Sequence, residues 1–347
     1  MKNILLTGGT GFIGSHIFIQ LIKCGYYITI IDSNINSSEK VIKRISDMSE
    51  LTPFFDIKKF KFYKGDIRNE ILLNDIFLSA KEQNNEIDAV IHLAGLKAVR
   101  ESKIKPLEYW ESNVSGSIIL FKVMQKFNCY NLIFSSSATI YSSDGTGFFD
   151  EDTIIKPINP YGNTKAAIEQ ILRDLFDSSP NLWRIACLRY FNPIGAHPSG
   201  NVCEDPKGIP NNIFPVLLKV ASREIDCLEV FGNDWETPDG TGIRDYVHVL
   251  DIADGHIMVL KYLMKNPPKV LNLNLGTGVG KSVMELINTF EEVNQIKINY
   301  VFSNRREGDI PRSVANIDLA KKLIGWDPKN KLADMCKDGW RSKLNNQ

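Results

Sequence analysis

Short apolar runs, separated by polar and glycine-rich stretches, recur through the first half of the chain. Runs 3–7, 27–31, 61–66, 89–93 and 132–134 each end at or close to glycine, serine or an acidic residue, which predicts buried strands. The stretch 15–24 between the first two runs predicts a helix that ends at Gly25. Strands that alternate with helices in this way indicate an α/β fold with a doubly wound parallel sheet of the Rossmann type.

The length of 347 residues leaves room for a smaller α/β lobe beside that sheet. We predict that the first lobe covers residues 1–192 and that the second, substrate-binding lobe covers residues 193–347. Residues 245–263 look helical, and part of the segment 241–263 is expected to pack back on the first lobe.

The composition, 43% hydrophobic and 24% charged, is that of an ordinary globular protein. The 41 basic and 41 acidic residues cancel, so charge gives no reason to expect nucleic acid or a membrane as a partner. The six cysteines show no paired spacing, which predicts reduced thiols in a cytoplasmic protein. Neither a signal peptide nor a run of roughly 18 apolar residues that would span a membrane is expected.

The first predicted strand runs directly into the glycine-rich turn 8–14. Strand, glycine turn, helix, strand and acidic residue are the context of a dinucleotide-binding fingerprint. Gly8 would allow the tight turn, Gly11 the approach of amides to a pyrophosphate, and Gly14 close helix packing. Asp32 would accept from the ribose hydroxyls and repel a 2′-phosphate, which favours NAD over NADP. The spacing is GxxGxxG rather than GxGxxG, and a flexible turn is the alternative interpretation.

A serine, a tyrosine and a lysine are candidates for catalysis next to that cofactor. Ser137 ends a predicted strand, and Tyr161 and Lys165 are spaced to share one helical face. Lowering a tyrosine pKa from about 10 to about 7 takes roughly 4 kcal/mol, which Lys165 and a cationic nicotinamide would supply together. Tyr161 would then be the general base for oxidation of a secondary alcohol, and Ser137 would hydrogen-bond the reacting oxygen. Taken alone, YxxxK is equally typical of a surface helix.

Seven stretches make the chain resemble the extended short-chain dehydrogenase/reductase family and, within it, the UDP-glucose 4-epimerases. They are residues 7–16, 134–141, 161–165, 188–200, 208–212, 231–249 and 305–309. The resemblance implies tightly held NAD and no net redox change. Tyr161 would take the proton of the sugar 4-hydroxyl as hydride leaves C4, the keto sugar would turn over, and hydride would return to the other face. The nucleotide must therefore be held firmly and the sugar loosely.

The resemblance also implies binding residues. On the cofactor side they are Gly8, Gly11, Phe12, Ile13, Gly14, Asp32, Ser33, Asp66, Ile67, Leu93, Lys97, Asn113, Ser137, Tyr161, Lys165 and Phe191. On the substrate side they are Ser137, Tyr161, Asn192, Asn211, Asn212, Phe231, Arg244, Arg306, Asp309 and Ser313. The arginines would bind the diphosphate, and Asp309 the uridine ribose. Family members are commonly homodimers through helices of the first lobe.

Several of these residues have plainer interpretations when taken alone. Arg244 would pair with neighbouring Asp245, and 305–307 would be a solvated charged run. Asp66 would be a helix N-cap, and Lys97 a surface lysine. The five histidines show no metal-ligand spacing, and His16 and His92 are expected in the core or in turns.

Departures from the family pattern bear on specificity. Ser33 stands where asparagine is frequent, and Leu93 where some members have phenylalanine. Ser313 stands where some members have tyrosine, and those members accept only the plain hexose. Because a hydroxymethyl group leaves more space than a phenol, we predict room for an N-acetylhexosamine.

Three rival functions stay open at this point. A nucleotide-sugar 4,6-dehydratase also oxidises C4, but such enzymes carry carboxylates directly after the strand-end hydroxyl residue, where this chain has Ala138 and Thr139. A 4-epimerase of another UDP sugar, such as a pentose or a uronate, is weakened but not excluded. A non-catalytic NAD-binding module would usually lack the tyrosine or the lysine.

Overall fold

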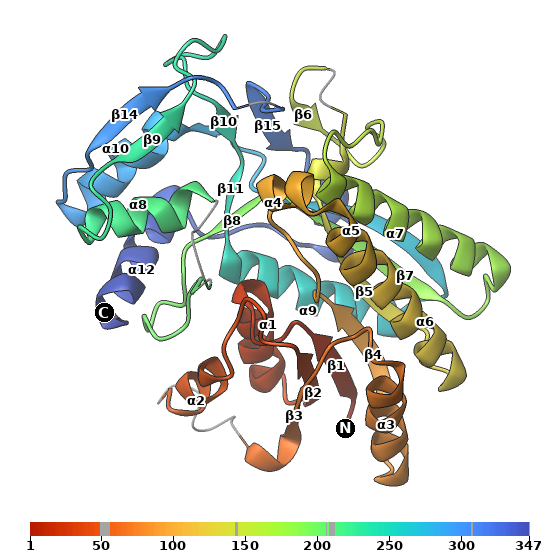
Figure 1. Ribbon diagram of the computed structural model, residues 1–347. Coiled ribbons are helices and arrows are strands. Elements are labelled where there is room, and N and C mark those ends of the chain that lie inside the picture. Colours follow the sequence, from red (N-terminus) through yellow and green to blue (C-terminus); the bar gives the residue numbers. More distant parts are fainter. Residues whose placement is uncertain (49–55, 143–144, 206, 208–211, 307, 347) are drawn as a thin grey trace.

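A seven-stranded parallel sheet forms the larger lobe of the computed structural model, which describes residues 1–48, 56–142, 145–205, 207, 212–306 and 308–346 (Figure 1). The strand order is β12-β7-β5-β4-β1-β2-β3. The strands are β1 (Asn3–Thr7), β2 (Tyr27–Asp32), β3 (Phe60–Lys64), β4 (Ile87–His92), β5 (Asn131–Ser137), β7 (Arg184–Tyr190) and β12 (Lys269–Leu275). The order reverses between β1 and β4, which confirms the predicted doubly wound, Rossmann-type sheet.

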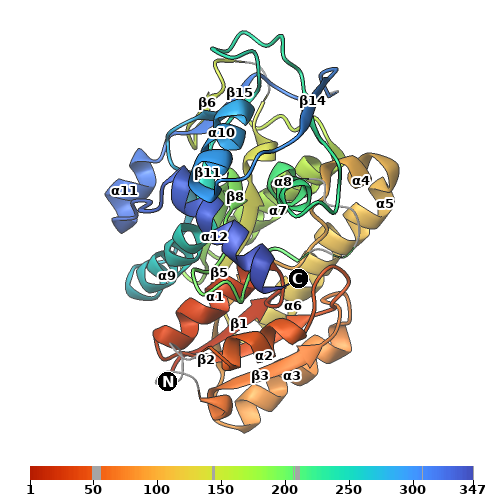
Figure 2. The same ribbon diagram turned by 90° about the vertical axis from the view of Figure 1, so that its left-hand side faces the viewer.

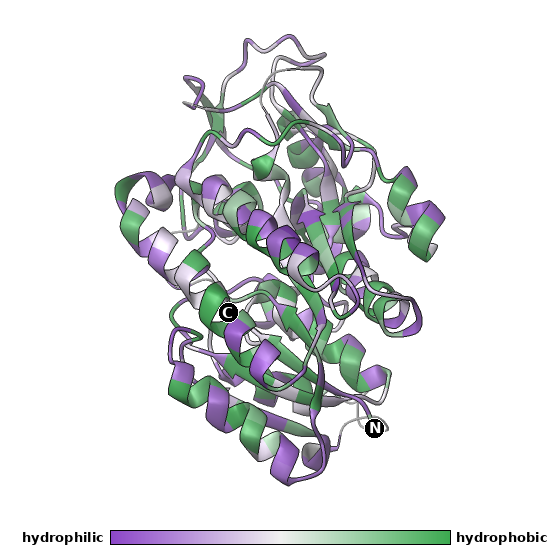
Figure 3. Cartoon of the chain, turned by 90° about the vertical axis from the view of Figure 1, so that its right-hand side faces the viewer, coloured by the Kyte–Doolittle hydropathy of each residue, from purple (hydrophilic) through white to green (hydrophobic). Residues whose placement is uncertain are grey.

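Helices cover both faces of this sheet. Ile4 and Leu6 point into a core shared with α1 (Phe12–Lys23), α2 (Lys40–Ser46) and α9 (Val249–Lys265). Leu5, between them, points into a second core under α3 (Glu70–Glu82), α6 (Gly116–Lys126) and α7 (Pro160–Ser178). Because successive residues of a strand face opposite sides, burial on both faces explains why the strands read as unbroken apolar runs. Figure 3 shows these mostly hydrophobic strands between helices of mixed character.

Two elements of the second half complete the first lobe. Strand β12 pairs with β7 along its whole length, from Lys269–Arg184 to Leu275–Tyr190. Helix α9 packs against α1, and Figures 1 and 2 both show the two helices side by side. The helix of this segment starts at Val249 rather than near residue 245, because Tyr246–His248 form strand β11. The division after residue 192 stays a prediction, with α9 and β12 lying on the first sheet.

The smaller lobe contains short strands and a few helices. Its strands are β8 (Asn192–Ile194), β9 (Leu228–Phe231), β10 (Ile243–Arg244), β11 (Tyr246–His248), β13 (Lys281–Ser282), β14 (Tyr300–Ser303) and β15 (Arg312–Ala315), joined by β6 (Phe148–Phe149) from the first half. Its helices are α8 (Ile213–Ala221), α10 (Val283–Asn294) and α12 (Leu332–Asn345), while α11 (Asp318–Ile324) packs on α9 and β12 of the first lobe. A third core lies among α8, α10, α12 and β9.

The remaining short helices lie in connections. They are α4 (Val99–Ile104), α5 (Pro106–Tyr109), the π-helical turn η3 (Trp110–Ser115), and the 3₁₀ turns η2 (Ile57–Lys59) and η4 (Ala138–Ile140). Within the described part of the chain, no helix combines the length and apolarity needed to cross a membrane. All six cysteines are described, and each has a free thiol.

Several predicted element boundaries differ from the structure, and two of the differences lie near the glycine turn and Asp66. The first helix begins at Phe12 rather than Ser15, because Gly11 already acts as its N-cap and accepts from the Ser15 amide. The third strand ends at Lys64, so Asp66 lies in the loop beyond it. Both shifts place more backbone at the carboxyl edge of the sheet, where ligands of such folds bind.

Candidate active site

The glycine turn after β1 has the shape of a phosphate cradle. Gly8 has a φ of +72°, in the left-handed region that favours glycine. A Cβ atom on Gly14 would lie 2.2 Å from the Gly8 carbonyl oxygen and 2.8 Å from the Gly9 Cα, so α1 packs against the turn more closely than any side chain allows. The free amides of the first turn of α1 start at this point, and a helix N-terminus is a ready site for an anionic group.

Asp32, at the end of β2, is held beside this turn. Its carboxylate accepts hydrogen bonds from the Thr10 amide at 3.0 Å, the Asn34 amide at 2.9 Å and the Ser37 hydroxyl at 2.9 Å. Ser33 follows it, half-buried. The carboxylate and the glycine turn therefore form one hydrogen-bonded unit at the edge of the sheet, as a ribose-and-pyrophosphate site requires.

Of the other residues predicted to bind the cofactor, two form ion pairs with other side chains and the rest are half-buried or buried. Asp66 forms an ion pair with Arg68 at 2.7 Å, which holds the pKa of its carboxyl below the usual value, and Asn69 rather than Asp66 caps α3. Lys97 pairs with Glu204 at 2.7 Å. Phe12, Ile13 and Leu93 are half-buried, while Ile67 and Phe191 are buried.

Asn113 links the loop after β4 to the helix that carries Tyr161. Its amide accepts from the Leu96 backbone NH at 2.7 Å and donates to the Leu96 carbonyl and to the Thr164 hydroxyl, both at 3.0 Å. Asn113 lies in the π-helical turn η3, a distortion that often marks functional sites. Its contacts fix the register of the loop against α7.

Ser137, Tyr161 and Lys165 come together at the carboxyl end of β5. Tyr161 lies in the first turn of α7, which Asn159 caps by accepting from the Gly162 amide at 2.8 Å. The Ser137 hydroxyl interacts with the Tyr161 phenol and opposes the rise of its pKa, and the Lys165 Nζ lies 5.8 Å from the centroid of the Tyr161 ring. The Lys165 Nζ donates to the Ser135 carbonyl at 2.7 Å. Two distant stretches of sequence thus meet at one strand end.

Burial controls the protonation of this group. It raises the pKa of Tyr161 to about 12, against the opposing hydrogen bond from Ser137, and lowers the pKa of Lys165 to about 8, against the opposing charge of Glu169. The lysine alone therefore does not make Tyr161 a base at neutral pH. A further cation next to the phenol is needed, which agrees with the expected contribution of the nicotinamide.

The predicted substrate residues of the second lobe form a separate group. The Arg306 guanidinium lies 3.8 Å from the centroid of the Phe231 ring, and burial lowers its pKa. Arg244 pairs with Asp309 at 3.2 Å. Ser313 lies next to Arg244 in the register of β10 with β15, and it is half-buried. A cation, an aromatic face and a carboxylate thus converge, as recognition of a nucleoside diphosphate requires.

The plainer interpretation fails for Arg244 and holds for Arg305. Asp245 does not pair with Arg244, because its carboxylate accepts from the Thr277 amide at 2.7 Å and from the Gly278 and Ala315 amides. Arg305 is a surface residue bound to Asp234 at 2.8 Å.

The structure describes two of the three asparagines predicted to bind the substrate. Asn192 lies on β8 at the junction with β11, and Asn212 stands at the N-cap position of α8. Asn211 lies outside the described residues.

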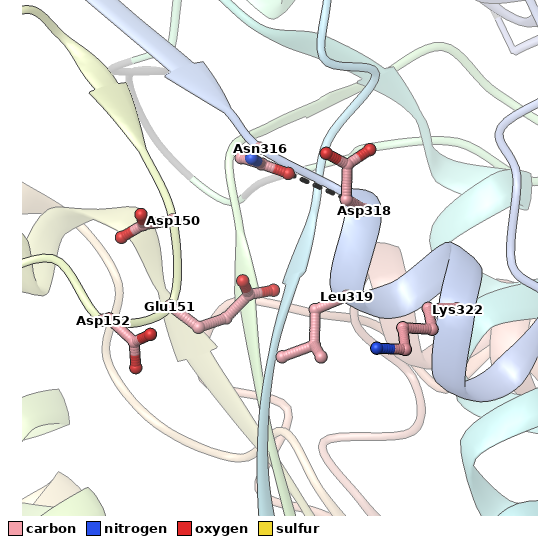
Figure 4. A pocket seen from close by; sticks show the side chains of 7 residues that line it. All are labelled: Asp150, Glu151, Asp152, Asn316, Asp318, Leu319 and Lys322. Atoms are coloured by element: carbon pink, nitrogen blue, oxygen red, sulfur yellow. Dashed lines mark hydrogen bonds between the residues drawn. The ribbon is translucent and has the colours of Figure 1, made fainter.

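A cavity of about 280 Å³ lies away from these residues, between the loop after β6 and the start of α11 (Figure 4). Asp150, Glu151, Asp152, Asn316, Asp318, Leu319 and Lys322 line it. None of the predicted site residues is among them. Its four carboxylates against one lysine would repel a diphosphate, so this cavity does not fit a nucleotide.

The sequence interpretation missed a buried charged group beneath Lys165. Glu169, four residues further along α7, is fully buried and binds Arg189 of β7 at 2.7 Å and the Ser136 hydroxyl at 2.6 Å. The helical spacing of Lys165 and Glu169 was the only available sign, since Arg189 comes from a strand 20 residues later.

Comparisons with known proteins identify the family of the chain. The profile of the family described as GDP-mannose 4,6 dehydratase matches residues 5–339. A UDP-glucose 4-epimerase of Bacillus subtilis is 44% identical over 343 residues, 99% of this chain and 97% of that protein. Solved UDP-glucose 4-epimerases are similar too. The one from Stenotrophomonas maltophila, with NAD and formylated UDP-arabinopyranose, has a TM-score of 0.93 at 40% identity over 100% of this chain and 99% of that one. The one from Bifidobacterium longum, with NAD+ and UDP, has a TM-score of 0.91 at 42% identity and covers 99% of each chain.

The residues after Ser137 distinguish between 4,6-dehydration and 4-epimerisation, the two reactions named in these matches. Ala138 and Thr139 follow it in η4, and the Thr139 hydroxyl donates back to the Ser137 oxygen at 3.0 Å. Elimination from a keto sugar needs an acid and a base at the sugar. Neither residue that follows Ser137 is a carboxylate, so this turn lacks the groups that a dehydratase of this family carries.

Proposed function

Because the chain belongs to the UDP-glucose 4-epimerases of the extended short-chain dehydrogenase/reductase family, we propose that it interconverts UDP-glucose and UDP-galactose with NAD. One observation carries the proposal. Ser137, Tyr161 and Lys165 meet beside a dinucleotide cradle, and no carboxylate follows Ser137 to divert the reaction to dehydration.

The residues around the glycine turn fit NAD. The space that a Cβ on Gly14 would fill is closed by backbone, the first-turn amides of α1 are free for a pyrophosphate, and Asp32 stands beside them for the ribose. When bound, NAD supplies the hydride acceptor that oxidises C4 of the sugar and the donor that reduces it again. Asp32 would also exclude a 2′-phosphate by charge.

The chain's own groups then divide the remaining work. Tyr161 takes the proton of the 4-hydroxyl, and the hydrogen bond with Ser137 positions the sugar oxygen and stabilises the phenolate. Lys165, anchored on the Ser135 carbonyl, keeps a positive charge near the phenol. Arg306 and Arg244 hold the diphosphate and Asp309 the uridine ribose, so that the sugar alone is free to turn over before Tyr161 returns the proton.

Purified protein incubated with UDP-galactose and no added NAD tests the proposal. Formation of UDP-glucose under these conditions supports both epimerisation and tightly held cofactor. Strict dependence on added NAD, with NADH accumulating, would instead identify a dehydrogenase.

We propose further that Ser313 leaves room for an N-acetylhexosamine. It is half-buried on β15 next to Arg244, and a serine fills less of the sugar site than a tyrosine. Turnover of UDP-N-acetylglucosamine by the wild type and its loss in Ser313→Tyr, with UDP-glucose turnover retained, is the expected result. A wild type that turns over UDP-glucose but not the acetylated sugar contradicts it. UDP pentoses belong in the same assay, because a similar enzyme was solved with a UDP-arabinopyranose derivative.

We also propose a homodimer, formed through α4, α5 and the adjoining η3. Leu107 is 81% exposed, Ile104 72% and Trp110 39%, an apolar patch that a partner copy would cover. Light scattering of wild type and Leu107→Glu tests this: a dimer that becomes a monomer supports it, and a monomeric wild type contradicts it. The free thiols are in keeping with an enzyme of the cytoplasm.

A further inference from the structure

A charged pair without solvent contact lies directly behind the catalytic lysine. Glu169 is 0% exposed and Arg189 is 1% exposed. Two parallel hydrogen bonds join them, from Arg189 Nε to Glu169 Oε1 at 3.0 Å and from Nη2 to Oε2 at 2.7 Å. The desolvation of such a pair often cancels its attraction, so the pair is not explained by stability alone.

The carboxylate of this pair is fixed toward the active-site strand. Glu169 accepts from the Ser136 hydroxyl at 2.6 Å, and Ser136 lies between Ser135, which binds Lys165, and Ser137, which binds Tyr161. On α7, Lys165 and Glu169 are four residues apart and therefore share a face. One turn of helix and three successive serines thus place the carboxylate next to the ammonium.

The charges around Lys165 show why this placement matters. The titratable groups that interact with the lysine or with Glu169 are His92 on β4, Tyr141 after η4, Tyr161 and Arg173 on α7, and Cys187 and Arg189 on β7. Glu169 is the carboxylate whose charge acts on Lys165, and Glu151 is a second carboxylate that acts on Arg189. Burial pulls the pKa of Lys165 down to about 8, and the carboxylate opposes this shift. The positive charge of Arg189 partly neutralises Glu169, which limits how far Glu169 can raise the pKa of Lys165.

We propose that Glu169 is a positioning residue which, held by Arg189 and Ser136, keeps Lys165 protonated beside Tyr161 during turnover. The inference rests on the proposed function, because it concerns the base of that reaction. Neither residue touches the sugar or the cofactor in this role. The pair acts through the charge of Lys165 alone.

The pH profile of kcat for Glu169→Gln tests the electrostatic part. Without the Glu169 carboxylate, Lys165 loses the negative charge that opposes its burial and still faces the buried cation Arg189, so Lys165 loses its proton at lower pH. The alkaline limb of kcat should move down by at least about one pH unit, which is roughly a fivefold loss at the pH of the wild-type midpoint. A merely structural role would lower kcat by one factor at every pH and leave the limb in place.

Two further variants keep the test independent of folding. Arg189→Gln leaves the carboxylate unbalanced, so the limb should move to higher pH. In Glu169→Gln/Arg189→Gln both charges are gone, and the limb should return to within about half a unit of the wild type. If the single variants shift the limb in the same direction, or the double variant shifts it as far as Glu169→Gln, the proposal is wrong.

A readout without turnover separates this inference from the proposed function. The ¹³Cε resonance of Lys165, assigned with Lys165→Met, gives the lysine pKa directly in the NAD-loaded protein. A lower lysine pKa in Glu169→Gln than in the wild type supports the inference even if UDP-galactose is not the substrate. An unchanged lysine pKa in a folded, active Glu169→Gln overturns the inference and leaves the epimerase function standing.

Discussion

Acid should destabilise this protein strongly, because four histidines are buried in their neutral form. Burial lowers the pKa of His16 and His92 to about 3 and that of His197 and His256 to about 4. The unfolded chain takes up these protons near pH 6.5, and the folded protein does not. The stabilisation is therefore complete above about pH 6.5 and is lost as the pH falls toward 4.

The size of the effect follows from the two pKa values of each ring. A pH of 5 lies about 1.5 units below the pKa of a histidine in the unfolded chain. Protonation therefore stabilises the unfolded chain by about 2 kcal/mol for each histidine, and the buried ring gains none of this. Four rings give about 8 kcal/mol, as much as many domains have in total. Burial raises the pKa of Glu151, Asp245 and Asp254, and these carboxyls bind protons before the unfolded chain does. They oppose the histidines and reduce the net loss.

Urea unfolding at pH 7.5, 6.5, 5.5 and 5.0 with saturating NAD measures this loss, followed by the fluorescence of the buried Trp183 and Trp326. The free energy of unfolding should fall by several kcal/mol between pH 7.5 and 5.0. His256, whose Nε2 meets the Tyr190 hydroxyl at 2.6 Å, offers a control outside the glycine turn. In His256→Gln the drop should shrink by about 2 kcal/mol. Equal free energies at pH 7.5 and 5.0 would refute the reasoning.

Three further predictions concern the site. Tyr161→Phe should lower kcat about 10²–10⁴-fold while NAD stays bound, as cofactor content after gel filtration would show; unchanged kcat would remove Tyr161 as the base. Gly14→Ala should lose NAD affinity, because its Cβ would lie 2.2 Å from the Gly8 carbonyl, whereas the Gly11→Ala Cβ would lie 3.3 Å from it and should weaken NAD binding much less. Calorimetric titration compares the two, and equal affinities would contradict the clash. Arg306→Lys should raise KM for UDP-galactose about tenfold with little change in kcat, since an ammonium cannot stack flat on Phe231 or fork toward a diphosphate; a fall in kcat alone would place Arg306 in the chemical step.

The local parts of the fold were predictable because the residues that determine them are consecutive in the sequence. The strand, glycine turn and helix of residues 3–23 follow from one apolar run and three glycines. Ser137 and the Tyr161–Lys165 pair were predictable as well. The strand end places Ser137 at the edge of the sheet, and the spacing of four residues places Tyr161 and Lys165 on one face of a helix. Their convergence follows from the parallel sheet, whose strand ends share one edge.

Contacts between distant stretches were not predictable in the same way. Arg244 had an acidic neighbour in Asp245, but the strand register turns Asp245 toward the Thr277 amide and leaves Arg244 to Asp309. Nothing local in the sequence marks Arg189 as the partner of Glu169. Such pairings depend on which strands become neighbours, and a single sequence does not record that.

The late entry of β12 into the sheet has a consequence for biosynthesis. A ribosome releases residues 1–192 well before Lys269–Leu275, yet until those seven residues emerge the outer edge of β7 has no pairing strand. Over the same interval α1 lacks its cover, α9. The nascent first lobe thus exposes an open strand edge and an apolar helix face, both prone to aggregation. A chain interrupted after residue 192 should therefore need a chaperone, whereas one that extends past residue 275 should not.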